Sequence, residues 1–191
     1  METFLTNRFR LELIEENHYQ YLKQYALEEK LWIYSTIKVK TEDDFKDYFN
    51  QALVLSDQTS QQAFVVYDIN QNDFVGMTRL YAFDSKNKSA KLGFTWYALN
   101  SQGNGINTHV KYLMFTYAFE KLGLERIELN ADLRNKRSIA AMQKMGAIQE
   151  GILRKNLFLP DGFKRDTIIF SVLKDDWENE LKLKFEDKIK G

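Results

Sequence analysis

The chain has 191 residues, which is the length of one globular domain. Its 44% hydrophobic and 14% aromatic residues should bury roughly 70% of the unfolded surface, which excludes a largely disordered chain. Lys plus Arg and Asp plus Glu number 27 each, which excludes a global basic field for nucleic acid, and the absence of cysteine excludes disulfides and a thiol nucleophile.

The first half of the sequence predicts one strand, two helices and a three-stranded meander. Residues 8–14 alternate as a strand does, and Asn17 can cap a helix after them. Thr41 precedes an acidic turn and an apolar stripe at three- and four-residue spacing, which predicts a second helix. Residues 62–69, 73–83 and 89–99 are β-branched and aromatic runs separated by turn sequences, which predicts antiparallel strands.

The second half predicts a long helix, a strand, a short helix and a hairpin. An apolar stripe marks the helix from residue 106 to 118, residues 126–132 read as a strand, and Asn135 can cap the short helix. Turn residues 160–162 join two strands into a hairpin. A helical crossover between the strands ending near residue 99 and beginning near residue 126 makes them parallel within a mixed sheet.

The end of the chain differs in composition from the rest. Residues 178–191 are mostly charged, so we expect a solvated terminal helix or a frayed tail after a single domain at 1–177. The first residues lack the apolar core of a signal peptide, and no stretch approaches the roughly 18 apolar residues of a membrane span. We therefore expect a cytoplasmic protein.

The segment with the clearest chemical meaning is Gln102-Gly-Asn-Gly-Ile-Asn107, at the start of the long predicted helix. Two glycines let the backbone turn sharply and leave N–H groups free at a helix N-terminus, where the dipole favours a phosphate or pyrophosphate. A plain strand-to-helix turn is the alternative. A Walker loop fits worse because the next lysine is Lys111, and a Rossmann fingerprint fits worse because Thr108 stands where it needs glycine.

These residues resemble the GNAT superfamily of acetyl-CoA-dependent N-acetyltransferases. Its phosphate-loop pattern is Gln or Arg, two residues, Gly, one residue, then Gly or Ala, which matches Gln102 and Gly105 and departs at Asn107. The runs at 118–129, 135–147 and 150–154 are similar to the RimJ/RimL-like branch, which includes enzymes that acetylate N-terminal amines of ribosomal proteins. The resemblance covers about residues 90–173.

The resemblance implies a mixed α/β fold, the GNAT fold. Its twisted, mostly antiparallel sheet has a central parallel pair that splays around acetyl-CoA, and helices cover both faces. The pantetheine arm is implied to lie against the backbone of residues 95–97, and the pyrophosphate on N–H groups of residues 103–108. The implied cofactor-binding residues are Thr95, Trp96, Tyr97, Gln102, Gly103, Asn104, Gly105, Ile106, Asn107, Thr108, Asn135 and Ser138, with no metal.

The implied reaction is direct transfer of the acetyl group to a primary amine, on a protein N-terminus or a small molecule. Many members protonate the leaving thiolate from a tyrosine, but the equivalent position here is Met142. Ser138, one turn earlier, is the implied catalytic substitute, and the alternative is an ordinary serine in the first turn of a helix. Asn135 can cap this helix, bond the pantetheine arm, or do both.

The general base is not identified. Several members place a glutamate where Lys91 stands, and Asp132, Glu128 and Asp84 are candidates by position only. Each is also explained as a solvated or cross-strand charge.

Other titratable residues have structural readings. Arg154 and Asp166 fall nearly opposite each other on the predicted hairpin, so we expect a cross-strand salt bridge, with a substrate gate as the alternative. The two histidines lack metal-ligand spacing. We expect His18 to face solvent and His109 to lie away from the phosphate.

The acceptor site is expected at the first two helices and the hairpin loop. Trp32, Tyr34, Tyr81 and Phe83 could line it, or could belong to the core, as such aromatic residues usually do. The acidic groups at 28–29 and 42–44 could attract a basic acceptor, or could simply be helix ends and solvated surface.

Three functions follow from these observations. The leading one is an acetyl-CoA-dependent N-acetyltransferase. The alternative is a catalytically inactive acyl-CoA-binding sensor or interaction module, because the usual Tyr and Glu are missing, and the third is an enzyme that uses another nucleotide. The expected partner is an amine acceptor, with no nucleic acid and no membrane, and a homodimer is left open.

Overall fold

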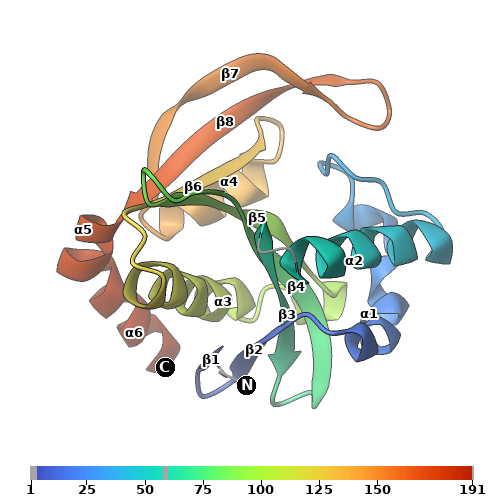
Figure 1. Ribbon diagram of the computed structural model, residues 1–191, viewed down its shortest axis with the longest axis horizontal. Coiled ribbons are helices and arrows are strands. Elements are labelled where there is room, and N and C mark those ends of the chain that lie inside the picture. Colours follow the sequence, from blue (N-terminus) through green and yellow to red (C-terminus); the bar gives the residue numbers. More distant parts are fainter. Residues whose placement is uncertain (1–3, 58–59, 191) are drawn as a thin grey trace.

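An eight-stranded sheet, in the order β1-β2-β3-β4-β5-β6-β8-β7, forms the centre of the molecule (Figure 1). This computed structural model describes residues 4–57 and 60–190. The strands are β1 (Phe4–Leu5), β2 (Phe9–Leu13), β3 (Gln61–Asp68), β4 (Asp73–Asp84), β5 (Ser89–Tyr97), β6 (Arg126–Asp132), β7 (Ile148–Phe158) and β8 (Lys164–Leu173). Neighbouring strands are antiparallel except β5 and β6, which are parallel, as the sequence predicts.

Helices cover both faces of this sheet (Figure 1). They are α1 (Tyr19–Ala26), α2 (Glu42–Asp57), α3 (Ile106–Phe115), α4 (Lys136–Lys144), α5 (Lys174–Asp176) and α6 (Lys182–Lys190). A π-helical turn, Thr116–Lys121, extends α3, and another, Trp177–Leu181, joins α5 to α6. The 3-10 turns are Glu16–His18, Glu29–Leu31 and Leu99–Ser101.

Two hydrophobic clusters fill the space between sheet and helices. The cluster under α1 and α2 includes Phe45, Phe49 and Trp96. The cluster under α3 is larger and includes Val110 and Phe170. Successive side chains of a strand point to opposite faces of a sheet, so the alternation seen in the sequence supplies both clusters.

The first two helices begin in different ways. At α2 the hydroxyl of Thr41 accepts a hydrogen bond from the Asp44 amide (3.1 Å), and the Asp44 carboxylate accepts one from the Thr41 amide (2.9 Å). This reciprocal cap confirms the predicted start. The prediction that Asn17 caps the first helix is wrong, because Asn17 lies inside the 3-10 turn that precedes α1.

The C-terminal helices pack on α3 and bury a full apolar stripe. The Trp177 side chain is fully buried and Phe185 is 3% exposed. The indole lies 5.8 Å from the ring of Phe115 and 6.2 Å from that of Phe119. The terminal helix is therefore present, but one side of it is part of the core and is not solvated.

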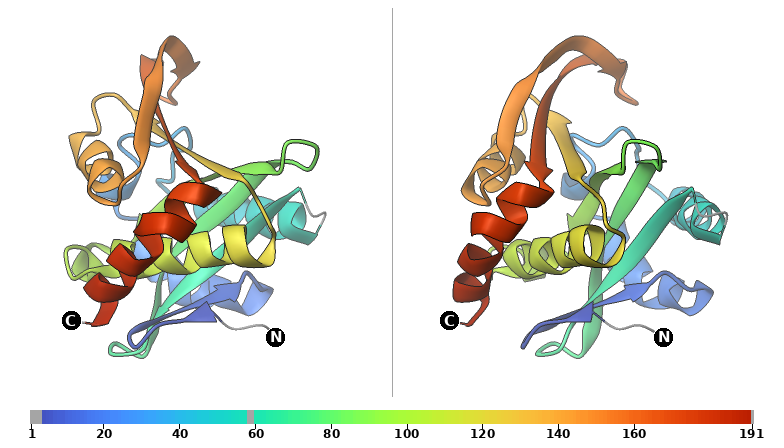
Figure 2. Two further views of the ribbon diagram at one scale, coloured as in Figure 1. Left: turned by 90° about the vertical axis from the view of Figure 1, so that its left-hand side faces the viewer. Right: turned by 60° about the vertical axis from the view of Figure 1, so that its left-hand side comes forward.

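The β7–β8 hairpin rises away from the rest of the molecule (Figure 2). Most β7 side chains are exposed, and the register with β8 shifts between Leu153 and Leu157. At this bulge the Asp166 carboxylate accepts a hydrogen bond from the Lys155 amide (2.7 Å). Arg154 and Asp166 form no ion pair in the described part of the chain, so the predicted cross-strand bridge is wrong.

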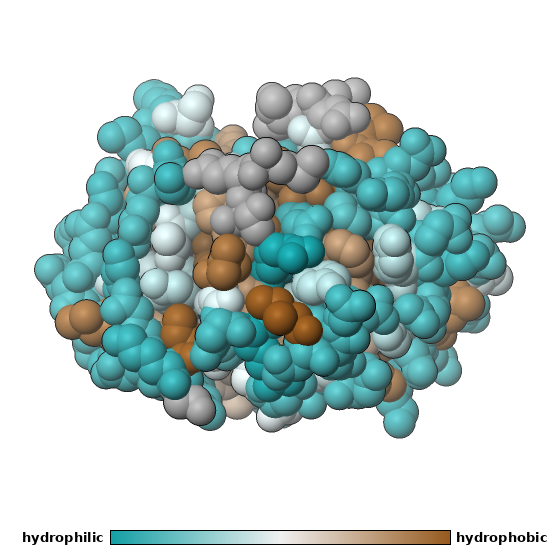
Figure 3. All heavy atoms as spheres, turned by 90° about the horizontal axis from the view of Figure 1, so that it is seen from below, coloured by the Kyte–Doolittle hydropathy of each residue, from teal (hydrophilic) through white to brown (hydrophobic). Residues whose placement is uncertain are grey.

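The outer surface is mixed in character. The face seen from below in Figure 3 is mostly hydrophilic, with hydrophobic side chains scattered over it. None of the helices within 4–57 and 60–190 combines the length and apolar character that crossing a bilayer requires.

Candidate active site

Strands β5 and β6 are paired only at one end. Their register joins Ser89 to Arg126, Ala90 to Ile127 and Lys91 to Glu128, and then stops. Both strands continue, β5 to Tyr97 and β6 to Asp132, without pairing each other. The facing edges beyond the last pair therefore carry backbone N–H and C=O groups that need another partner. The predicted splay of this parallel pair is confirmed.

A β-bulge bends β5 within the splayed region. Residues 77 and 79 of β4 pair with residues 96 and 93 of β5, so β5 holds one extra residue. Phe94 takes a positive φ of 50°, a conformation that costs a non-glycine residue about 1–3 kcal/mol. The buried guanidinium of Arg79 lies 4.8 Å from the Phe94 ring and 4.3 Å from the Tyr48 ring, which supports the bend.

The glycine-rich loop after β5 turns sharply into α3. Gly103 and Gly105 have φ of 85° and 90°, in the left-handed region that favours glycine. The Gly105 carbonyl accepts the amide hydrogen bonds of Thr108 (2.8 Å) and His109 (3.3 Å), which closes the first helical turn. A Cβ added at Gly103 would meet no atom within 4 Å, so open space lies beside the loop.

Several amide donors of this loop have no partner among the residues that the structure describes. Ile106 N reaches the Asn104 side-chain oxygen only at 3.4 Å. In the described ranges no acceptor is present for the backbone N–H of Gly103, Asn104, Gly105 and Asn107. Free N–H groups at a helix N-terminus bind anions, so the loop fits a diphosphate.

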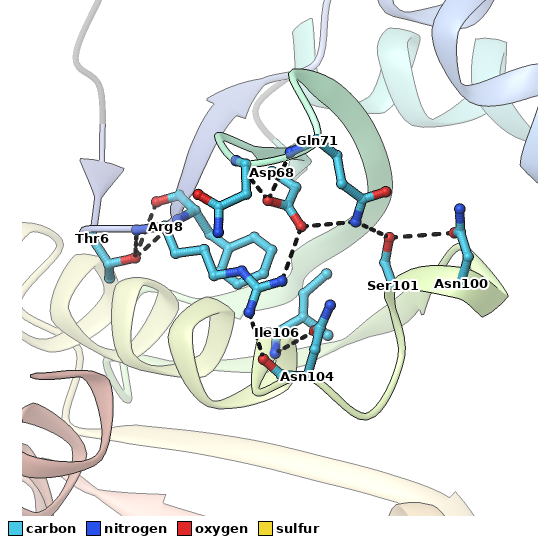
Figure 4. A network of polar contacts seen from close by, with 10 residues as sticks. Thr6, Arg8, Asp68, Gln71, Asn100, Ser101, Asn104 and Ile106 are labelled. Carbon is cyan, nitrogen blue, oxygen red and sulfur yellow. Dashed lines mark hydrogen bonds and ion pairs between the residues drawn. The ribbon is translucent and has the colours of Figure 1, made fainter. Parts of the chain in front are cut away.

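A polar network holds the loop from the neighbouring strands (Figure 4). The Arg8 guanidinium donates to the Asn104 carbonyl (3.1 Å) and lies 3.6 Å from the buried Asp68 carboxylate. The side-chain amide of Gln71 donates one hydrogen bond to the Asp68 carboxylate (2.9 Å) and one to the Ser101 hydroxyl (3.0 Å). The loop is thus fixed before any ligand arrives, which lowers the entropic cost of binding.

The side chains at the end of β5 support the backbone. The side-chain amide of Gln102 donates a hydrogen bond to the Tyr97 carbonyl (2.8 Å). The Tyr97 hydroxyl donates one to the Asn107 side-chain oxygen (3.2 Å). Burial raises the pKa of Tyr97, so its hydroxyl stays neutral. Trp96 points to the other face, where it packs 6.0 Å from Trp32. The side chains of Trp96 and Tyr97 are therefore engaged in the protein, and a ligand between the strands would meet the backbone groups of these two residues.

Helix α4 places a free hydroxyl beside β6. The Asn135 side chain accepts a hydrogen bond from the Ser138 amide (3.0 Å), so Asn135 caps this helix. The Ser138 side chain is half-buried, and its hydroxyl has no partner among the described residues. Met142 is buried in the core. Ser138 is therefore the hydroxyl that α4 can offer to a ligand.

None of the three carboxylates considered as a base is poised for that role. Burial tends to raise the pKa of Asp132, but the bonds from Arg134 (2.7 and 3.0 Å) outweigh it and hold the pKa below its usual range. Glu128 is ion-paired with Lys91 at 2.7 Å. The Asp84 carboxylate accepts hydrogen bonds in the β4–β5 turn, which lower its pKa.

Both histidines are structural. The prediction that His18 faces solvent is wrong, because the 3-10 turn directs the ring inward to within 4.7 Å of the Phe74 ring. Its Nδ1 accepts the Glu15 amide at 2.9 Å. His109 bonds the Thr6 hydroxyl at 2.9 Å, and its ring lies 3.9 Å from where a Cβ on Gly105 would be. Burial lowers the pKa of both rings.

Tyr81 crosses the splay on the face covered by α1 and α2. Its ring lies over Gly93, where an added Cβ would be 3.1 Å from the ring and 3.3 Å from the hydroxyl oxygen. Asn130 on β6 lies near this hydroxyl and favours its charged form, but burial has the larger effect on the pKa of Tyr81. Burial raises the pKa of Tyr81, so a neutral phenol stands beside the splayed strands.

The other predicted acceptor residues lie elsewhere. Trp32 and Phe83 belong to the hydrophobic clusters, and the Tyr34 carbonyl accepts a hydrogen bond from Arg165 (3.3 Å). The 42–44 acidic group starts α2, where Asp44 caps the helix. Segment 29–40 and hairpin residues 159–161 enclose a pocket of about 200 Å³, which gives the hairpin loop a place near the expected acceptor side.

Sequence reasoning missed Lys111. This α3 lysine is 5% exposed, and its ammonium donates to the Thr95 hydroxyl at 3.1 Å. Thr95 in turn lies 2.7 Å from the Thr78 hydroxyl. Burial lowers the pKa of Lys111 to about 7. No sequence signal marks it, because a lysine inside an amphipathic helix is usually solvated.

The family comparison agrees with this geometry. A family model described as an acetyltransferase (GNAT) domain matches residues 8–148. The Bacillus subtilis (strain 168) protein YdaF, named provisionally as a ribosomal N-acetyltransferase, is 34% identical over 65% of this chain and 66% of its own length. The ribosomal-protein-serine acetyltransferase of Escherichia coli (strain K12) is 22% identical over 83% of this chain and 89% of its own length.

Solved structures share the whole architecture. A crystal structure from T. thermophilus, described provisionally as an acetyltransferase, has a TM-score of 0.86 at 28% identity and covers 98% of this chain and 97% of its own. The fold is also that of spermidine N-acetyltransferase from Vibrio cholerae in complex with CoA and spermine. That structure has a TM-score of 0.77 at 19% identity and covers 91% of this chain and 100% of its own.

Proposed function

The chain belongs to the acetyltransferase (GNAT) domain family, and from this premise we propose that it acetylates the N-terminal amine of a protein, with acetyl-CoA as donor. The family transfers acetyl groups to amines, so the proposal concerns the acceptor and the residues that act. One observation carries it. Pairing of β5 with β6 stops after three residue pairs, next to a loop of free amides, which gives an extended acyl carrier both an edge and an anion site.

The chain's own groups fit coenzyme A in two places. The amides of residues 103–107 would take the diphosphate, because they are unpaired at a helix N-terminus. The unpaired edge of β5 from residue 93 to 97 would take the amides of the pantetheine arm as an added strand. Asn135 is occupied as a helix cap, which leaves its side-chain N–H groups free for the arm.

Bound acetyl-CoA supplies an acyl carbon activated by a thiol leaving group. Backbone N–H groups on the splayed part of β5 would stabilise the oxyanion that forms when an amine attacks. The Ser138 hydroxyl would donate a hydrogen bond to the leaving sulfur, and the neutral Tyr81 phenol would orient the acceptor. The enzyme has no cysteine, which accords with direct attack.

The electrostatics favour an N-terminal amine over a lysine or polyamine. An α-amine has a pKa of about 8 and is partly neutral at physiological pH, whereas a lysine amine at about 10.4 needs a base. Asp132, Glu128 and Asp84 are each held by other groups. An acceptor that loses its proton to water therefore suits this site best, and the names of YdaF and the Escherichia coli relative support the same class.

A binding module without catalysis is the rival, because Met142 occupies the usual tyrosine position. The test incubates the chain with acetyl-CoA and peptides that begin with Ser, Ala or Met, with their N-blocked forms containing one lysine, and with spermidine. Free thiol and the mass of each acceptor are measured. We expect acetylation of the free N-termini. Turnover of spermidine or blocked peptides alone would contradict the acceptor class.

Absence of turnover with every acceptor, combined with tight coenzyme A binding, would instead establish the binding module. Calorimetry that shows ATP or NAD binding more tightly than acetyl-CoA would overturn the donor assignment and support an enzyme of another nucleotide.

A further inference from the structure

A buried cation lies beside the splay without a carboxylate partner. Lys111 projects from α3 toward the sheet, and the hydrogen bond to the Thr95 hydroxyl (3.1 Å) is the one polar contact of its Nζ in the described chain. The neighbouring His109 bonds Thr6 instead. The ammonium therefore keeps two N–H donors without protein acceptors, which an apolar side chain at this position would avoid.

Thr95 connects this ammonium to the splayed strands. It stands in the β5 bulge, beyond the last residue that pairs with β6, and its side chain is partly exposed. Its hydroxyl contacts the Lys111 ammonium on one side and the Thr78 hydroxyl of β4 (2.7 Å) on the other. The Thr95 hydroxyl is the group that the Lys111 ammonium contacts, the Gly93 carbonyl lies 3.4 Å from that hydroxyl, and burial is the one cause that shifts the pKa of Lys111.

The reaction needs an acid that the other residues do not supply. A thioester that loses its acyl group leaves a thiolate, which must take up a proton. Met142 has none to give, the Ser138 alcohol is a weaker acid than a thiol, and burial raises the pKa of the Tyr81 phenol. Lys111 is a buried cationic group that a hydrogen bond to Thr95 joins to the splayed part of β5.

We propose that Lys111, acting through the Thr95 hydroxyl, supplies the proton that the departing thiolate of coenzyme A takes up; this rests on the function proposed above. The acceptor N–C bond forms as the C–S bond breaks, and the C–S electron pair stays on sulfur. The Thr95 hydroxyl proton moves to sulfur, and a Lys111 ammonium proton replaces it. The proton of the acceptor amine goes to water, and water later reprotonates Lys111.

The acidity of the buried lysine matches this task. With its pKa near 7, the ammonium is about half protonated at neutral pH, and it is a stronger acid than a thiol, whose pKa is about 8.5. Transfer to sulfur is therefore downhill. A solvated lysine, at about 10.4, would not drive it.

The first test needs no turnover. The thiol of bound coenzyme A is titrated by the ultraviolet absorbance of its thiolate, in the wild type, in Lys111→Met and in the exposed-lysine control Lys88→Met. We expect a fraction of the bound thiol to ionise already through about pH 7 in the wild type and in the control, because the Lys111 ammonium favours the thiolate until it loses its own proton, and we expect no such early step in Lys111→Met. Equal titration in all three overturns the proposal.

A second pair of variants tests the relay. Thr95→Val removes the hydroxyl at constant shape and should lower kcat as Lys111→Met does, whereas Thr95→Ser keeps the hydroxyl and should keep kcat near the wild-type value. If Thr95→Val keeps the wild-type kcat, the relay is wrong. If Lys111→Met binds coenzyme A and desulfo-coenzyme A equally less tightly than the wild type does, and the titration of the bound thiol is unchanged, Lys111 is only a binding contact.

Turnover gives the kinetic counterpart. Lys111→Met should lower kcat by about 100-fold, the lower end of general acid effects, with less than about threefold change in KM for acetyl-CoA. The wild-type kcat should fall as the pH rises through about 7, because Lys111 then loses its proton. The kcat of Lys111→Met should not show this decrease. The same decrease of kcat with pH in Lys111→Met would overturn the proposal. If no amine is acetylated at all, the proposed function is wrong. The titration of the bound thiol still tests whether Lys111 acts on the sulfur.

Discussion

Gly105 is the residue on which the diphosphate site depends most directly. Its φ of 90° turns the loop into α3, and an added Cβ would point past the His109 ring at 3.9 Å. Gly105→Glu would place a carboxylate among the free amides and should abolish coenzyme A binding in calorimetry. Gly105→Ala separates backbone strain from charge and should bind more tightly than Gly105→Glu. Equal, wild-type affinity in both variants would contradict the loop assignment.

Ser138 carries a hydroxyl that we propose to hydrogen-bond the leaving sulfur. Ser138→Ala removes this hydroxyl and leaves the cap, because the Asn135 side chain bonds the amide of residue 138. We expect kcat to fall by about 10- to 100-fold with coenzyme A affinity nearly unchanged, as for an interaction made in the transition state. Steady-state kinetics and calorimetry measure the two quantities. Equal losses in both would reduce Ser138 to a structural contact.

Lys111 should make stability depend on pH. Its pKa is about 7 in the folded protein against an ordinary 10.5, so the unfolded chain binds more protons between these values. The free energy of unfolding therefore rises with pH in that window. Lys111→Met removes the buried charge and should be more stable than the wild type by about 1 kcal/mol or more at pH 6. The gain should shrink toward pH 10 in denaturant titrations, and a gain that stays constant would show that Lys111 does not titrate there.

Single residues differ in how far the sequence reveals them. Gly105 and Asn135 were predictable, because a left-handed turn before a helix and a helix cap each select a residue type locally. Lys111 was not, since its burial depends on Thr95 and Thr78 from strands that are distant in sequence. The prediction that His18 faces solvent is wrong for a similar reason, because the 3-10 turn changes which way its ring points.

Helix α6 and the turn before it provide the clearest test at the level of an element. Phe185 is 3% exposed and Leu183, on the same helix, is 63% exposed. Phe185→Ala should lower the free energy of unfolding by about 3–5 kcal/mol, whereas Leu183→Ala should change it by less than about 0.5 kcal/mol. Thermal or urea unfolding compares them. Equal midpoints would show that this helix does not belong to the core.

The elements were predicted best where their pattern is strong. The three-residue spacing in α2 and the alternation in β3 to β5 reflect burial of one face, so they are visible locally. The two-residue strand β1 is too short for such a pattern. The C-terminal segment was misjudged because its many charges conceal Trp177, Leu181 and Phe185, which recur every four residues on one helix face.

The proposed donor site is visible only at the scale of the whole sheet. It requires β5 and β6 to pair for three residues and then separate, a bulge at Phe94 to bend β5, and a loop that is held by Arg8, just before β2, and by Gln71, just after β3. Periodicity shows none of these features, and the resemblance to the GNAT superfamily implied the splay. The acceptor is less determined by the sequence, because Tyr81 reaches β6 only once Gly93 leaves space for its ring.

A crystal structure of the chain with coenzyme A bound tests the central claim most directly. We predict the diphosphate on the backbone amides of residues 103–107 and the pantetheine arm between β5 and β6, against residues 93–97, with the sulfur toward Thr95. Coenzyme A bound elsewhere, or a splay filled by protein side chains while the ligand is present, would contradict the account.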